Sequence, residues 1–196
     1  MIPAFLLVLV AVVYRIATGI LVQSGSATWL SNFAPLAAIA LCGAAFFPTR
    51  FKFTVPFLAL LVSDLVLNSY YGATLFDPLI LGRYLALILV GVLGLALQHR
   101  TALKTLLLAT VGGSVIFYFI TNFFSWVSDP GYVKSAAGLV QALTVGLPAY
   151  SATPTWMFFG NSLASDLVFT GLFVLAVHFG RSPERAPAAA AVPRAA

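Results

Sequence analysis

The chain has 196 residues, of which 61% are hydrophobic and only 8% are charged, whereas soluble domains carry about 25% charged residues. So few polar side chains cannot cover a water-facing surface. The composition therefore excludes a soluble enzyme, a disordered chain and a nucleic-acid binder, although ten Lys and Arg face five Asp and Glu. It is typical of a polytopic membrane protein.

Six apolar stretches predict transmembrane helices, because about 20 residues cross roughly 30 Å of hydrocarbon. In chain order they are 3–22, 33–47, 53–70, 79–98, 104–125 and 155–179. The second stretch is short for a crossing, and we expect Asn32 to cap it. Residues 135–147 have helical periodicity but are too short to span, which predicts a re-entrant or interfacial helix that ends before Pro148.

Residues 1–180 are predicted to form a single integral membrane domain, and the Ala/Pro-rich residues 181–196 a disordered cytoplasmic tail. If the N-terminus is cytoplasmic, the segments on the opposite side of the membrane hold one basic residue, Lys134. The cytoplasmic segments then hold Arg50, Lys52, Arg100, Lys104, Arg181, Arg185 and Arg194. The positive-inside rule therefore predicts that both termini are cytoplasmic.

Four ionisable residues fall within the predicted spans: Arg15, Asp64, Arg83 and Asp166. Each one costs on the order of 2.5–3.5 kcal/mol in hydrocarbon unless it has a partner or faces a wet cavity. Two positive and two negative charges can neutralise each other, so we expect all four to face the interior of the bundle.

Polar side chains also recur on the last two predicted spans. Ser114, Tyr118, Asn122 and Trp126 are spaced every four residues, and residues 161–166 place Asn161 and Asp166 on one arc of a helix. These stripes and the charges converge in the outer half of the bundle, which predicts a pocket open to the outside. The predicted solute-binding residues are Arg15, Asp64, Asn68, Tyr118, Asn122, Trp126, Asn161 and Asp166.

Each of these residues has a predicted role and an alternative one. Asp64 and Asp166 would hold polar or cationic groups of the solute, or keep Arg15 in place. Tyr118 and the two asparagines at 122 and 161 would exchange hydrogen bonds with the solute, and Trp126 would stack on a flat ring. Alternatively, Arg15 with either aspartate is only an ion pair between helices, and Trp126 is an interfacial anchor.

Motifs for catalysis are absent from the sequence. The chain has no GxxxxGK[ST] segment, no HExxH segment and only two histidines, and its single cysteine, Cys42, excludes an internal disulfide. A dyad of His178 with Ser162 or Ser165 would span at least about 20 Å along one helix. We therefore expect neither an enzyme nor a cofactor.

Several segments carry a family resemblance: NFAPLAAIAL from Asn32, VPFLALLVSDL from Val55, TNFFSW from Thr121, AGLVQALTVGLP from Ala137 and GNSLASD from Gly160. They resemble a family of uncharacterised putative transport proteins that is itself similar to the substrate-binding S components of energy-coupling factor (ECF) vitamin transporters. The resemblance implies a six-helix S-component-like bundle in a bacterial cytoplasmic membrane, with an outward-facing site for a vitamin or a related precursor. It also implies partners, namely a transmembrane coupling protein and two ATPase subunits.

Three functions remain open at this point. The first is an S-component-like subunit that captures a small organic solute from the outer side. The second is a stand-alone proton-coupled or facilitative carrier in which Asp64 or Asp166 titrates. The third is a structural or assembly protein of the membrane that has no ligand.

Overall fold

The computed structural model describes residues 2–74 and 78–180. Within these ranges the regular elements are all helical, and no strand is present, which confirms the predicted all-α class. The α-helices are α1 (Ile2–Gln23), α2 (Leu36–Phe46), α3 (Thr54–Tyr71), α4 (Pro78–Ala96), α5 (Leu103–Ser128), α6 (Ala136–Leu143) and α7 (Thr155–Phe179). Two 3-10 turns, η1 (Thr28–Leu30) and η2 (Thr49–Phe51), precede α2 and α3. The predicted disordered tail, 181–196, lies outside the described residues.

Five helical segments are long and apolar enough to cross a membrane: Ile2–Gln23, Thr49–Tyr71, Leu79–Ala96, Leu103–Ser128 and Thr155–Phe179. These five helices are those of a multi-pass membrane protein. The remaining predicted crossing, 33–47, contains only the 11-residue helix α2, whose length is about 16 Å. A sixth crossing stays a prediction, because α2 alone covers about half of the hydrocarbon thickness.

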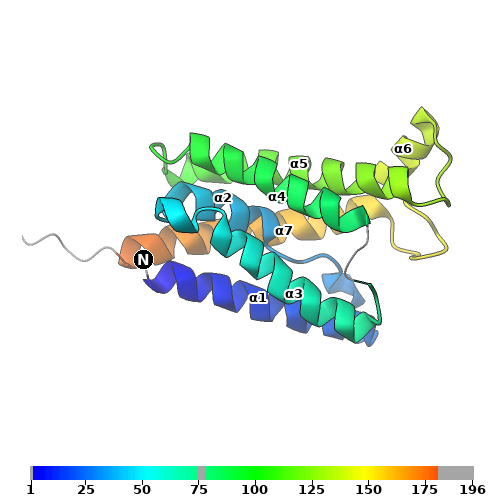
Figure 1. The fold of residues 1–196 in the computed structure, drawn as a ribbon, viewed down its shortest axis with the longest axis horizontal. Coiled ribbons are helices and arrows are strands. Elements are labelled where there is room, and N and C mark those ends of the chain that lie inside the picture. Colours follow the sequence, from blue (N-terminus) through cyan, green and yellow to red (C-terminus); the bar gives the residue numbers. More distant parts are fainter. Residues whose placement is uncertain (1, 75–77, 181–196) are drawn as a thin grey trace, which may run out of the picture.

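The bundle is elongated, with the helices running along its length (Figure 1). α1 packs against α3, and α4 packs against α5, while α2 contacts α3, α4, α5 and α7. α2 is therefore central, and residues 37–45 are all buried. The start of α1 and the end of α7 lie at the same end of the bundle, and α6 lies at the other end (Figure 1).

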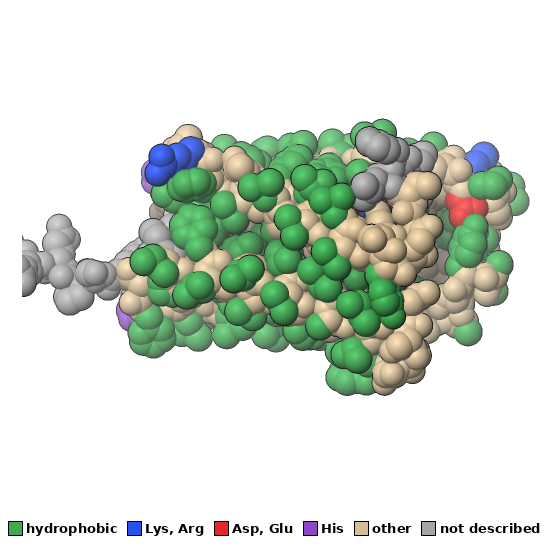
Figure 2. Space-filling view, turned by 60° about the horizontal axis from the view of Figure 1, so that its bottom comes forward, with side chains coloured by type: hydrophobic (Ala, Val, Ile, Leu, Met, Phe, Trp, Pro, Cys, Tyr) green, Lys and Arg blue, Asp and Glu red, His purple; other side chains and the backbone are tan. Residues whose placement is uncertain are grey.

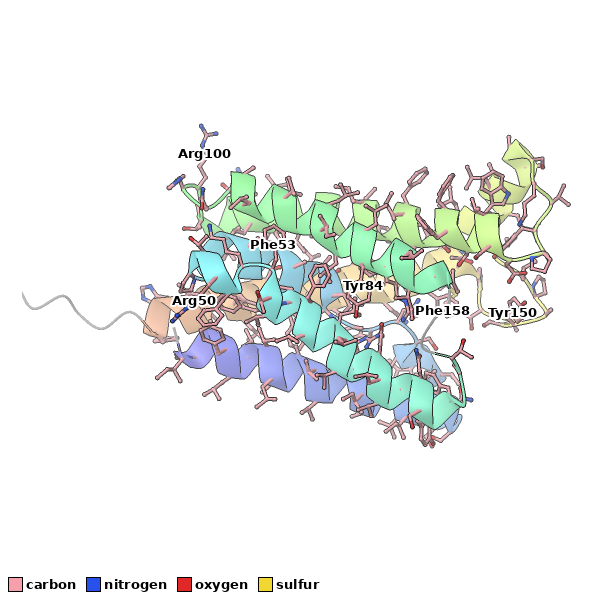
Figure 3. The ribbon with its side chains drawn as sticks, in the orientation of Figure 1. Arg50, Phe53, Tyr84, Arg100, Tyr150 and Phe158 are labelled. Carbon is pink, nitrogen blue, oxygen red and sulfur yellow. The ribbon has the colours of Figure 1, made fainter. Side chains whose placement is uncertain are left out.

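Apolar side chains cover much of the length of the molecule, and charged side chains stand out at the two ends of the face shown in Figure 2. On α1, for example, Leu6 is 56% exposed and Val13 is 59% exposed, as expected for a helix that faces lipid. Arg50 and Arg100 lie at the end where α1 begins, whereas Tyr150 lies at the opposite end (Figure 3). We call these the basic end and the α6 end.

Helix α2 lies unusually close to α4. A Cβ atom added to Gly94 of α4 would lie 2.2 Å from the carbonyl oxygen of Leu41 in α2, which is far inside van der Waals contact. Glycine is required at this position because the two backbones approach each other so closely.

The short helix α6 ends earlier than the sequence predicts. The predicted range was 135–147, with Pro148 as the terminator, but the helix ends at Leu143. Gly146 adopts a left-handed φ of 72°, and its N–H donates to the carbonyl of Gln141 at 2.8 Å. The Gln141 amide donates back to the carbonyl of Gly146 at 3.1 Å. The glycine turn, rather than the proline, therefore stops the helix.

Candidate functional site

A cavity of about 380 Å³ lies toward the α6 end of the bundle. Its lining comes from α1, residues 32–37, α4, α5 and α7, and from the loops on either side of α6. Asp166, Ser114 and the first turn of α2 form one part of the wall. Phe158 lines the cavity from α7, and Tyr150 lines it from the loop before α7; both are labelled in Figure 3.

Three helices meet at an ion-pair cluster beside the cavity. Arg15 of α1 donates from Nη2 to Oδ1 of Asp64 on α3 at 2.7 Å, and Arg83 of α4 donates from Nη1 to the same oxygen at 3.1 Å. Arg15 also donates to the hydroxyl of Ser63. The Asp64 side chain is 4% exposed, against 12% for Arg15 and 26% for Arg83. We call these three charged residues the arginine cluster.

The two arginines line the cavity, whereas Asp64 lies behind them. The expectation that an aspartate keeps Arg15 in place is met by Asp64. Both guanidinium groups use the one oxygen Oδ1, and Oδ2 of Asp64 has no hydrogen-bond partner within the described residues. One carboxylate therefore neutralises one of the two positive charges.

The other predicted acid, Asp166, has a different set of partners. Oδ1 accepts a hydrogen bond from the N–H of Ala38 at 2.9 Å, and Oδ2 accepts one from the Ser114 hydroxyl at 2.8 Å. Asp166 is 2% exposed. Because Ala38 is in the first turn of α2, the carboxylate satisfies an N–H that has no partner within its own helix.

Asp166 thus takes the capping role that the sequence assigned to Asn32, and that assignment was wrong. Asn32 adopts a left-handed φ of 59°, and α2 begins only at Leu36, after Pro35, which has no side chain able to cap. An aspartate far along the chain supplies the acceptor instead, and its negative charge is favourable at a helix N-terminus.

Two further predicted residues line the cavity. The Tyr118 hydroxyl donates to the carbonyl of Leu143 at 2.5 Å, which ties α5 to the end of α6. The side-chain amide of Asn122 donates to the carbonyl of Tyr118 at 2.8 Å. Of the eight predicted residues, those on the cavity wall are Arg15, Tyr118, Asn122 and Asp166.

The other four are placed elsewhere. Asp64 lies behind the arginines, and Asn68 is buried on α3 one turn further along. Asn161 donates to the carbonyls of Trp29 and Ser31 at 2.8 and 2.9 Å, so it fastens the loop after α1 to α7. The Trp126 indole donates to the carbonyl of Val133 at 2.9 Å and braces the turn between α5 and α6.

Several lining residues were absent from the predicted set. Arg83 was noted as a charge within a span but was not assigned to the site. Phe158 lies one turn before Ser162 on α7, so the helical period of that stripe could have identified it. Tyr132 and Tyr150 lie in loops, where no periodic pattern marks them.

Tyr150 stands at the rim and is 75% exposed. A hydrogen bond to the Asp129 carboxylate, together with the negative charge of Asp129, raises the pKa of Tyr150 above its usual value. The phenol therefore stays neutral at physiological pH and offers a hydroxyl group at the rim.

Residues 1–188 match a family with the description "Family of unknown function (DUF6580)". The chain belongs to this family. The matched range includes every helix described above. No curated protein and no solved structure was found to match the chain.

Proposed function

We propose that the chain is a membrane transport protein that binds a small organic solute, a vitamin or a related precursor. The cavity carries this proposal. Its volume of about 380 Å³ falls within the roughly 300–1,000 Å³ of small-molecule sites. The charges of two arginines and an aspartate on its wall have a high free-energy cost inside a membrane bundle, and such residues commonly mark a solute pathway.

The position of the cavity supports binding from the outer side. It lies toward the α6 end, whereas the turns between α2 and α3 and between α4 and α5 hold Arg50, Lys52 and Arg100, and the first turn of α5 holds Lys104. Arg50 and Arg100 are seen at the basic end in Figure 3. The positive-inside rule assigns the basic end to the cytoplasm. In this orientation both termini are cytoplasmic, in the bacterial cytoplasmic membrane.

The resemblance to S components supports a binding subunit that works with a transmembrane coupling protein and two ATPases. The contacts of the aspartates favour this reading over a proton-coupled carrier. Asp64 holds two guanidinium groups, and Asp166 caps α2, so protonation of either one would weaken the bundle itself. A purely structural protein would need the ion pairs but would gain nothing from a cavity beside them.

Two measurements test the proposal. Thermal unfolding of the purified protein with a panel of vitamins and nucleoside precursors is expected to show stabilisation by at least one solute. Cellular uptake of that solute should then require the coupling protein and the ATPases. No stabilisation across the panel would count against solute binding, while uptake that survives loss of the ATPases and collapses with the proton gradient would point to the stand-alone carrier.

A further inference from the structure

Most hydroxyl groups on the α5 and α7 walls of the cavity already donate their proton. Thr121 donates to the carbonyl of Phe117 at 2.8 Å, and Ser162 donates to the carbonyl of Phe158 at 2.8 Å. Tyr118 and Ser114 donate to Leu143 and Asp166. What these groups still offer to a solute is oxygen lone pairs, which accept hydrogen bonds.

The arginine cluster offers the opposite. Each guanidinium carries five N–H donors; within the described residues Arg83 donates one hydrogen bond, and Arg15 donates two. The cluster holds two positive charges and one negative charge, so it keeps a net charge of +1 at the cavity wall.

Asp166 does not cancel this excess charge. Its two oxygens accept from Ala38 and Ser114, and no ion pair joins it to either arginine within the described ranges. The N-terminus of α2, which carries about half an elementary positive charge, offsets part of its charge locally. The cavity therefore has a cationic donor side at the arginines and an acceptor side on α5 and α7.

We infer, on the basis of the proposed function, that the solute is a small carboxylic acid that also carries hydroxyl or N–H groups. The carboxylate binds between Arg15 and Arg83, since guanidinium groups match a carboxylate with paired, charge-assisted hydrogen bonds. The hydroxyl or N–H groups donate to the oxygens on α5 and α7. A monoanion matches the net charge of +1, whereas a phosphate dianion would leave an uncompensated negative charge.

Matched pairs of solutes test this inference on the purified full-length protein. Each pair replaces a carboxylate with a neutral group of similar size: pantothenate and panthenol, biotin and biotin amide. Phosphate monoesters form a third arm. We expect a carboxylate member to bind, and its neutral partner to bind about tenfold more weakly or worse.

Substitutions at Arg83 give the second readout, because Asp64 and Arg15 remain paired without it. Arg83→Gln is expected to weaken binding of the carboxylate member about tenfold and to leave the neutral member unchanged. Arg83→Lys, which keeps the charge but loses the planar fork, should fall between the two. Arg100→Gln at the basic end is the control and should bind as the native chain does. A melting curve without solute shows whether each variant is folded. If Arg83→Gln is not folded, the comparison of Arg83→Lys with the native chain provides the test.

The outcomes separate the two levels of the argument. If neutral members or phosphate esters bind as well as the carboxylates, or if Arg83→Gln binds unchanged, the carboxylate assignment is overturned while solute binding stands. If no member of any pair binds, the proposed function fails and this inference fails with it.

Discussion

The Asp166 carboxylate of α7 accepts a hydrogen bond from the backbone N–H of Ala38 in α2, 128 residues earlier in the chain, at 2.9 Å. α2 is short, and its first turn lies inside the bundle next to the cavity. Within hydrocarbon an N–H group without a partner costs several kcal/mol. Asp166 therefore joins the last helix to the central one and fixes the wall of the cavity at the same time.

Loss of this cap should destabilise the protein. Asp166→Ala leaves the Ala38 N–H and the Ser114 hydroxyl without their acceptor, and we expect a loss of about 2 kcal/mol in the free energy of unfolding. Asp166→Asn keeps one acceptor oxygen and should lose less. Thermal unfolding in detergent gives the order of the variants.

Ser162→Ala is the matched control on the same helix. Within the described residues its hydroxyl donates only to the carbonyl of Phe158, so its removal should change stability by no more than about 0.5 kcal/mol. Equal effects of Asp166→Ala and Ser162→Ala would contradict the capping role.

The arginine cluster predicts an order of severity. Asp64→Asn leaves two guanidinium groups without a counter-charge in the bundle and should cost about 3–5 kcal/mol. Arg83→Gln should cost much less, because the Arg15–Asp64 pair remains neutral. Unfolding curves of the two variants check this order, and an Asp64→Asn protein as stable as Arg83→Gln would show that the cluster does not hold α1, α3 and α4 together.

The close approach of α2 and α4 gives a prediction with an internal control. Gly94→Ala places a methyl group 2.2 Å from the Leu41 carbonyl oxygen, and we expect a loss of about 2 kcal/mol from the forced separation of the helices. Gly112→Ala meets nothing within 4 Å and should be neutral or slightly stabilising, since alanine is the better helix former. Similar melting temperatures for the two variants would rule out the tight crossing.

The membrane orientation can be tested by cysteine labelling in cells. The native Cys42 is fully buried and should stay unlabelled. With a membrane-impermeant maleimide, Lys134→Cys is expected to react in intact cells, and Arg100→Cys only after permeabilisation. The reverse pattern would place the cavity on the cytoplasmic side.

The sequence predicted the helical class and five of the long helices, because a 20-residue apolar stretch is a local signal. It predicted poorly where distant contacts decide. The start of α2 depends on Asp166, and the end of α6 depends on the turn at Gly146. Neither appears in the periodicity of the segment concerned.

Four of the eight predicted site residues line the cavity. Contacts between distant segments decide where the others lie. The polar stripe on α5 led to Tyr118 and Asn122, which line the cavity, since helical spacing puts them on one face. The same stripe misplaced Trp126, because the chain turns after Ser128 and brings the carbonyl of Val133 to the indole. The partner of Arg15 could not be predicted either, because nothing in the sequence indicates that Asp64, rather than Asp166, forms the ion pair with it.

The most direct test of solute binding is native mass spectrometry of the gently solubilised protein. Ser162 lines the cavity, so Ser162→Trp fills it, whereas Val168 is 54% exposed on the outer face of the same helix and Val168→Trp leaves the cavity open. The account predicts a co-purifying small molecule on the native chain and on Val168→Trp, and none on Ser162→Trp. A molecule retained equally by all three proteins, or absent from the native chain, would contradict a solute-binding cavity.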